Sequence, residues 1–111
     1  MTVLVVLAMF VTACGSTPPP EPPVGTQAAT GRELFVGEFG CNTCHPGGQK
    51  GVGRDLVGPE FRQRHPTDAS VREQIRNGGG QMPAYGEERM SEQQLQDVIA
   101  YIRWLNEQQA Q

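Results

Sequence analysis

The chain has 111 residues, a formal net charge of −3 and an aromatic content of 6%. The acidic balance disfavours a nucleic-acid partner, and few β-branched residues follow Val36, which argues against a β-sheet. The 82 residues from position 30 to the end suffice for one domain. A domain of that size buries only about 60–65% of its unfolded surface and is marginally stable by itself.

The first 13 residues are almost wholly apolar and carry no charge. They are too few to span a bilayer, which takes about 20 residues, but they fit the apolar part of a secretory signal. The run ends in Val11-Thr12-Ala13-Cys14-Gly15, which resembles a bacterial lipobox. We predict that residues 1–14 form a lipoprotein-type signal ending at a lipidated Cys14. The alternatives are a plain secretory signal with an incidental cysteine and an uncleaved apolar anchor.

A proline-rich segment follows, because residues 17–24 contain five of the nine prolines. Such a run excludes helix and central strand and favours the extended polyproline II conformation. We therefore expect residues 15–29 to be a stiff tether with a reach on the order of 40 Å. A disordered linker is compatible with the same composition.

The first predicted helix covers residues 30–39, and the most informative motif of the chain follows it. Cys41-Asn42-Thr43-Cys44-His45 is the Cys-x-x-Cys-His signature of c-type haem attachment. Two thiols at this spacing can add to the two vinyl groups of a porphyrin, and the adjacent imidazole can ligate its iron. We predict that Cys41 and Cys44 bind one haem c covalently and that His45 is the proximal iron ligand.

Three other uses of the two cysteines fit the sequence less well. A thioredoxin-like pair needs a preceding strand, and Glu38-Phe39-Gly40 is not one. A structural zinc site needs four ligands, and Cys14 is the only other cysteine. A disulfide between Cys41 and Cys44 would close a very short loop and stabilise little.

The second predicted helix covers residues 69–76, with Asp68 as N-cap and Gly78 as the stop. Met82 lies in the glycine-rich loop that follows, directly before a proline. A thioether is a soft ligand for ferrous iron, so we predict that Met82 is the distal ligand.

Three other residues compete with Met82 for that role. Met90 is expected to pack in the core, Met9 belongs to the signal, and His65 would give bis-histidine ligation but fits a surface turn better.

The third helix has the clearest pattern. Ser91-Glu92-Gln93-Gln94 reads as a capping box, which marks its start. One buried stripe is then formed by Leu95, Val98, Ile99, Ile102 and Leu105.

With these residues the chain resembles the class I cytochrome c family, over residues 30–107. Gly31, Phe35 and Tyr101 match the positions at which the family's first and last helices cross. The segment 75–85 matches its ligand segment. Gly53-Arg54-Asp55-Leu56 is similar to its Gly-Pro-x-Leu, in which a carbonyl accepts a hydrogen bond from the proximal histidine.

The resemblance implies a small all-α cytochrome c fold of about three main helices and glycine-rich loops around one covalent haem, forming residues 30–111. With both axial positions filled, we expect an electron carrier, not an enzyme, with no small-molecule substrate. Its partners would be respiratory or photosynthetic complexes. Its place would be the outer, periplasmic or extracellular face of a bacterial cytoplasmic membrane, where Cys14 anchors it.

Two other functions stay open. One is a fixed haem subunit of a larger membrane oxidoreductase. The other is a haem sensor or peroxidase-like enzyme, which needs a vacant or labile sixth position on the iron.

Overall fold

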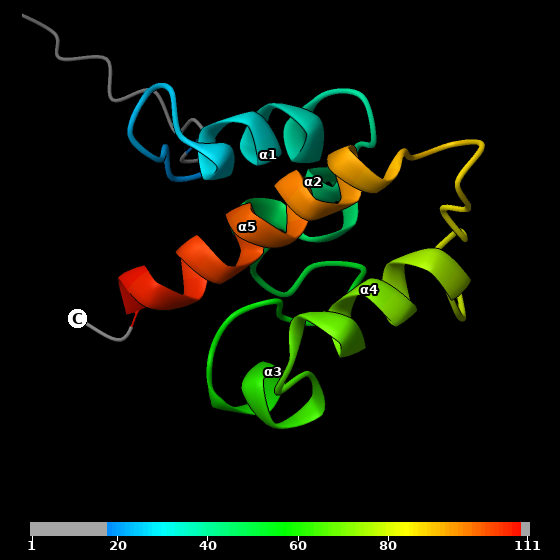
Figure 1. Cartoon of the computed structure of the whole chain (residues 1–111). Coiled ribbons are helices and arrows are strands. Elements are labelled where there is room, and N and C mark those ends of the chain that lie inside the picture. The colour runs from blue at the N-terminus through cyan, green and yellow to red at the C-terminus, as the bar shows by residue number, and fades with distance from the viewer. Residues whose placement is uncertain (1–17, 110–111) are drawn as a thin grey trace, which may run out of the picture.

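The computed structural model describes residues 18–109, and within them every regular element is helical (Figure 1). The predicted signal segment 1–14, with Cys14 and Met9, and the start of the predicted tether lie outside the described residues. Among residues 18–109, no helix has the length and apolar character that a membrane crossing requires. The predicted all-α class is confirmed.

The chain order is α1 (Gln27–Val36), α2 (Cys41–Cys44), the 3₁₀ turn η1 (Pro46–Gly48), α3 (Pro59–Arg64), α4 (Asp68–Asn77) and α5 (Glu92–Gln109). Figure 1 shows α1 lying across one side of α5, with α3 and α4 on the other side of it.

Helix α1 begins three residues before the predicted start and ends at Val36 instead of residue 39. The side-chain oxygen of Thr26 caps it by accepting a hydrogen bond from the Ala29 amide. The Thr26 hydroxyl in turn donates to the carbonyl of Pro23 at 2.7 Å, so the proline-rich segment and the helix start are joined. The helix therefore takes up the last residues of the segment expected to be tether.

The later helices follow the predictions more closely. Helix α4 starts at Asp68, but its N-cap is Thr67, not Asp68, and it stops at Gly78 as predicted. The capping box of α5 is confirmed, because the Ser91 hydroxyl accepts from the Gln94 amide and the Gln94 side chain accepts from the Ser91 amide. Helix α3 was not predicted, since Phe61 is its only buried residue and one residue sets no period.

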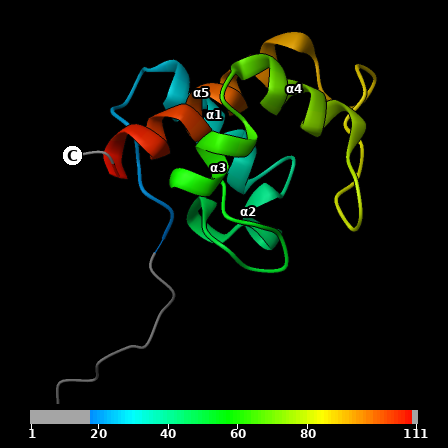
Figure 2. The same ribbon diagram turned by 90° about the horizontal axis from the view of Figure 1, so that it is seen from below.

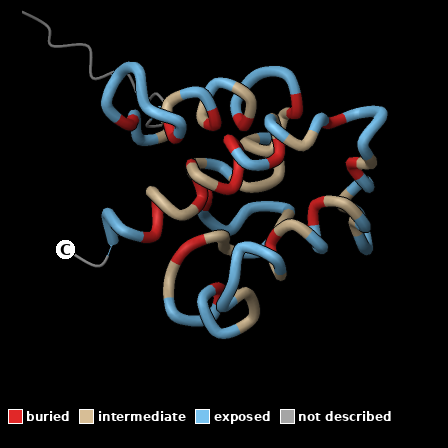
Figure 3. Tube along the Cα trace, viewed as in Figure 1, coloured by how far each residue is buried: buried red, intermediate tan, exposed pale blue. Residues whose placement is uncertain are grey.

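The core lies where α1 crosses α5, and buried positions recur along α5 (Figure 3). Phe35 and Tyr101 are fully buried and meet edge to face, with ring centroids 5.3 Å apart. A Cβ placed on Gly31 would lie 1.8 Å from the carbonyl oxygen of Asp97. Only a glycine therefore allows the two backbones to approach this closely, and the predicted crossing is confirmed.

The buried polar side chains of α5 connect it to its neighbours. Asn106 accepts a hydrogen bond from the Gly58 amide at 3.1 Å and donates to the Leu56 carbonyl at 2.9 Å. The long loop before α3 is thus fixed to α5 by a satisfied buried amide.

Gly31→Ala is expected to lower the free energy of unfolding by at least the about 1–3 kcal/mol of a typical overpacked site. The added methyl group meets backbone, which cannot rotate away as a side chain does. Guanidinium unfolding followed by Trp104 fluorescence would measure the loss. Thr30→Ala, an exposed change on the same helix, should stay within about 0.5 kcal/mol of the parent; equal stability of the two variants would contradict the close crossing.

Candidate functional site

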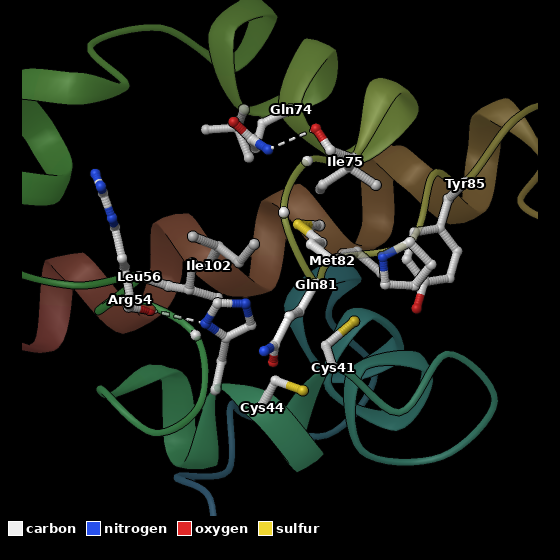
Figure 4. Close-up of a pocket in the computed structure, with 18 of the residues that line it drawn as sticks. Cys41, Cys44, Arg54, Leu56, Gln74, Ile75, Gln81, Met82, Tyr85 and Ile102 are labelled. Atoms are coloured by element: carbon white, nitrogen blue, oxygen red, sulfur yellow. Dashed lines mark hydrogen bonds between the residues drawn. The ribbon is translucent and has the colours of Figure 1, made fainter.

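A cavity of about 810 Å³ opens between α2, α4, α5 and the loops that join them. This volume lies within the range of about 300–1,000 Å³ that is usual for ligand and cofactor sites. Much of its wall is apolar, with contributions from Phe35, Leu56, Phe61, Val71, Ile75, Val98 and Ile102. The structure brings all four of the predicted haem residues of the domain, Cys41, Cys44, His45 and Met82, to this one cavity (Figure 4).

The two cysteines lie at the ends of the single helical turn α2. Both are half-buried and both are free thiols, so the structure gives no support to a disulfide between them. Burial raises the pKa of the Cys41 thiol to about 11. The thiol of Cys41 is therefore protonated at neutral pH.

His45 is the C-cap residue of α2, and a main-chain carbonyl group fixes the orientation of its imidazole ring. Its Nδ1 lies 2.7 Å from the carbonyl oxygen of Arg54, the bond drawn as a dashed line in Figure 4. Because a carbonyl can only accept, Nδ1 carries the proton and Nε2 has a free lone pair. Arg54 therefore supplies the predicted carbonyl although it stands where the family has proline.

Gly53 makes this arrangement possible, which the sequence did not indicate. A Cβ at that position would lie 2.2 Å from Cε1 of His45. The Gly53 amide also donates to the Cys44 carbonyl at 2.9 Å, so this loop folds tightly over the end of α2. The imidazole thus packs directly on the main chain of the loop.

Met82 comes from the glycine-rich loop after α4 and is half-buried against the core. Its amide and carbonyl pair with those of Gly79 at 2.9 and 3.0 Å, which closes a tight turn. Gly78 lies behind this turn, because a Cβ there would be 2.7 Å from the Met82 carbonyl oxygen. The loop therefore presents Met82 on a constrained backbone.

Tyr85 holds that loop in place, a role that the sequence analysis missed. Its amide donates to the Ile75 carbonyl at 3.0 Å, and its buried hydroxyl donates to the Phe39 carbonyl at 3.0 Å. Phe39 precedes the Cys-x-x-Cys-His motif, and the two rings meet edge to face at 5.8 Å. Tyr85 thereby joins the methionine loop to the segment of the cysteines.

Met90 and His65, the two described residues that compete with Met82 as iron ligand, differ in whether they line the cavity. Met90 is fully buried in the core and is not among the residues that line the cavity, as expected for a packing residue. His65 lies half-exposed in the connection between α3 and α4, but it also lines the cavity, so position alone does not exclude it as a ligand. Its ring packs on Phe61, its Nδ1 lies 2.7 Å from the Ser70 hydroxyl, and burial, followed by the charge of Arg64, lowers its pKa.

The charges of the described lining residues favour a group that carries carboxylates. Arg54 and Arg64 both line the cavity, and none of these residues is an Asp or Glu. A haem brings a flat apolar ring, two vinyl groups for thiols, an iron for an imidazole and a thioether, and two propionates for cations. The residues of the cavity fit each of these parts.

Two similarities to known proteins agree with this geometry. Residues 26–102 match the family model described as cytochrome C oxidase, cbb3-type, subunit III. A cytochrome c6 from Gloeothece citriformis (strain PCC 7424) is 31% identical over 85 residues, which is 74% of each chain.

Gly53→Ala is expected to displace the His45 imidazole and to cost at least the about 1–3 kcal/mol of an overpacked site. The absorption spectrum of the purified protein should show a reduced fraction of normally ligated haem. Lys50→Ala is the control, because the Lys50 side chain is exposed in the same loop and Lys50 is not among the residues that line the cavity. A Gly53→Ala protein with the parent's spectrum and stability would rule out the backbone support of His45.

Proposed function

Because the chain belongs to the class I cytochrome c family, with one covalently bound haem c and its iron, we propose that it is a membrane-tethered carrier of single electrons. Its donors and acceptors would be protein complexes of a respiratory or photosynthetic membrane. The observation that carries the proposal is the cavity in which a fixed imidazole and a loop methionine are both available to one iron.

The residues would share the work as follows. Cys41 and Cys44 hold the haem through thioether bonds, and His45 offers Nε2 to the iron while Arg54 holds Nδ1. Met82 offers its sulfur from the other loop, and a His/Met pair raises the reduction potential. When bound, the haem iron supplies the ferric–ferrous couple. Filling both axial positions leaves no place for oxygen or peroxide, which argues for transfer and against catalysis.

The proposal extends to the location of the protein. The apolar N-terminal run and Cys14 support export and lipid attachment at the outer face of a bacterial membrane. Stable attachment takes more than one acyl chain, and a lipidated Cys14 would supply several. Periplasmic export is also typical of the cytochrome c family.

A second candidate function is a fixed haem subunit of a membrane oxidoreductase. The matching family is described as a subunit of a cbb3-type oxidase, which favours this alternative. Purification in mild detergent separates the two functions. A complex that survives high salt indicates a fixed subunit, whereas release of the free cytochrome indicates a mobile carrier.

Met82→Ala is expected to abolish the weak far-red absorption band of ferric haem with a methionine ligand. Met90→Ala is the matched control and should keep the band, because Met90 lies in the core and not at the cavity. The reduced parent should not bind carbon monoxide, whereas reduced Met82→Ala should. Ready binding of carbon monoxide by the parent would refute the role of Met82 and favour the sensor or peroxidase class.

Mass spectrometry of the mature N-terminus tests the anchor. We expect the first residue to be Cys14, with the added mass of a diacylglycerol group, and Cys14→Ser to release the protein from membranes. An unmodified Cys14 within a longer or shorter chain would show that the segment is a plain signal or an uncleaved anchor.

A further inference from the structure

We propose that the domain binds its own proline-rich segment, and that residues 18–22, here called the strap, form a docked element instead of a free tether. Figure 2 shows the first described residues crossing α5 near its C-terminal end before the chain turns into α1, in agreement with the bond from Tyr101 to Pro20. The contacts come from two separate parts of the fold, α1 and α5, and the strap also passes close to η1.

Arg32 of α1 makes the largest set of contacts with the strap. Its Nε donates to the Pro19 and Pro20 carbonyls at 3.3 and 3.2 Å, and its Nη2 donates to the Pro19 carbonyl at 3.0 Å. The same guanidinium pairs with the Glu21 carboxylate at 3.4 Å. The Arg32 side chain is only 20% exposed, so its guanidinium group makes these bonds largely shielded from solvent.

Tyr101 of α5 makes the second contact. Its hydroxyl donates to the Pro20 carbonyl at 2.9 Å. The Tyr101 ring is itself fixed, since it packs on Phe35 and stacks on Trp104 with centroids 6.1 Å apart. Pro20 is thus bonded from two helices at once.

The proline rings of the strap also lie close to the domain. Pro22 is buried. A Cβ placed on Gly47 of η1 would lie 3.9 Å from Cδ of Pro20, which is ordinary van der Waals contact. The strap therefore lies against the turn that follows the haem-attachment motif.

The chemistry of these contacts suits a proline-rich ligand. Proline has no N–H, and a polyproline II segment makes no internal hydrogen bonds, so its carbonyls are acceptors in need of donors. Surfaces that recognise such segments combine aromatic rings with hydrogen-bond donors. Arg32 and Tyr101 supply the donors, and the strap of the same chain supplies the ligand.

Docking shortens the tether, a consequence that rests on the proposed anchor at Cys14. Only Gly15, Ser16 and Thr17 separate Cys14 from the strap. At no more than about 3.6 Å per residue, this stretch gives the docked domain a reach on the order of 10–15 Å instead of about 40 Å.

Energy transfer to the haem tests the docking in the full-length holoprotein in detergent. A fluorescent maleimide is attached to Ser16→Cys, since Cys41 and Cys44 are consumed by the haem and a lipidated Cys14 is blocked. We expect one short donor lifetime with a narrow distribution. In Arg32→Gln combined with Tyr101→Phe, the lifetime should lengthen and its distribution should broaden.

Two further variants keep the result interpretable. Arg62→Gln removes an exposed arginine of α3 and should keep the narrow lifetime. Pro19→Gly combined with Pro20→Gly changes only the strap, leaves the domain intact, and should broaden the lifetime as well. Unchanged haem absorption shows that each variant is folded.

The proposal is overturned if the parent lifetime is already as broad as that of the double variant, or if neither set of changes alters it. A lifetime that depends on protein concentration would assign the contact to a second copy and would also overturn it. Failure of the anchor is seen separately: the protein without Ser16→Cys would then take up dye at Cys14. That labelled protein reports on the docking in the same way.

Discussion

The close approach of α1 and α5 at Gly31 is the constraint on which the other parts of the structure depend. A carbonyl of α5 occupies the space in which any side chain at position 31 would stand. This contact brings Phe35 against Tyr101 and places Val98 and Ile102 at the back of the cavity. It also brings Arg32 and Tyr101 close enough to bond the same carbonyl of Pro20. The cofactor cavity and the strap therefore both depend on this one helix crossing.

The cavity itself depends on two loops that are held mainly by backbone hydrogen bonds. On one side, the loop at residues 51–54 folds over α2 and directs a carbonyl to His45. On the other, Tyr85 joins the methionine loop to Ile75 and Phe39. In a chain with 14 glycines, such bonds hold loops whose ordering on folding costs much entropy. These bonds fix the backbone on both sides of the cavity, at His45 and at Met82.

The sequence predicted well what is encoded locally. The capping box at Ser91, the stop at Gly78 and the stripe along α5 depend on neighbours within a few residues, and all three were found. The residues that the cysteine and histidine spacing and the methionine before a proline singled out all line one cavity, and their roles toward a haem stay predictions. The resemblance to a family added the helix crossing, which no local pattern encodes.

What was missed has several causes. The ordering of the proline segment depends on Tyr101, which lies 81 residues after Pro20, and no composition or spacing rule contains such a contact. The start of α1 is set by Thr26, a local cap whose hydroxyl also bonds Pro23, within the run that composition assigned to the tether. Helix α3 has a single buried residue and hence no period. His65 lies half-exposed between α3 and α4, and its place at the cavity depends on the path of the chain there.

The bond from His45 to residue 54 has a consequence for how such a protein can change. The acceptor is a main-chain oxygen, which every amino acid carries, so the geometry of the ligand does not depend on the side chain at that position. The Arg54 side chain is exposed and also lines the cavity. Its charge can therefore be varied, and with it the electrostatic field at the haem, while the histidine keeps its orientation. A substitution at position 54 can thus change the driving force for electron transfer without changing the main-chain bond that orients His45.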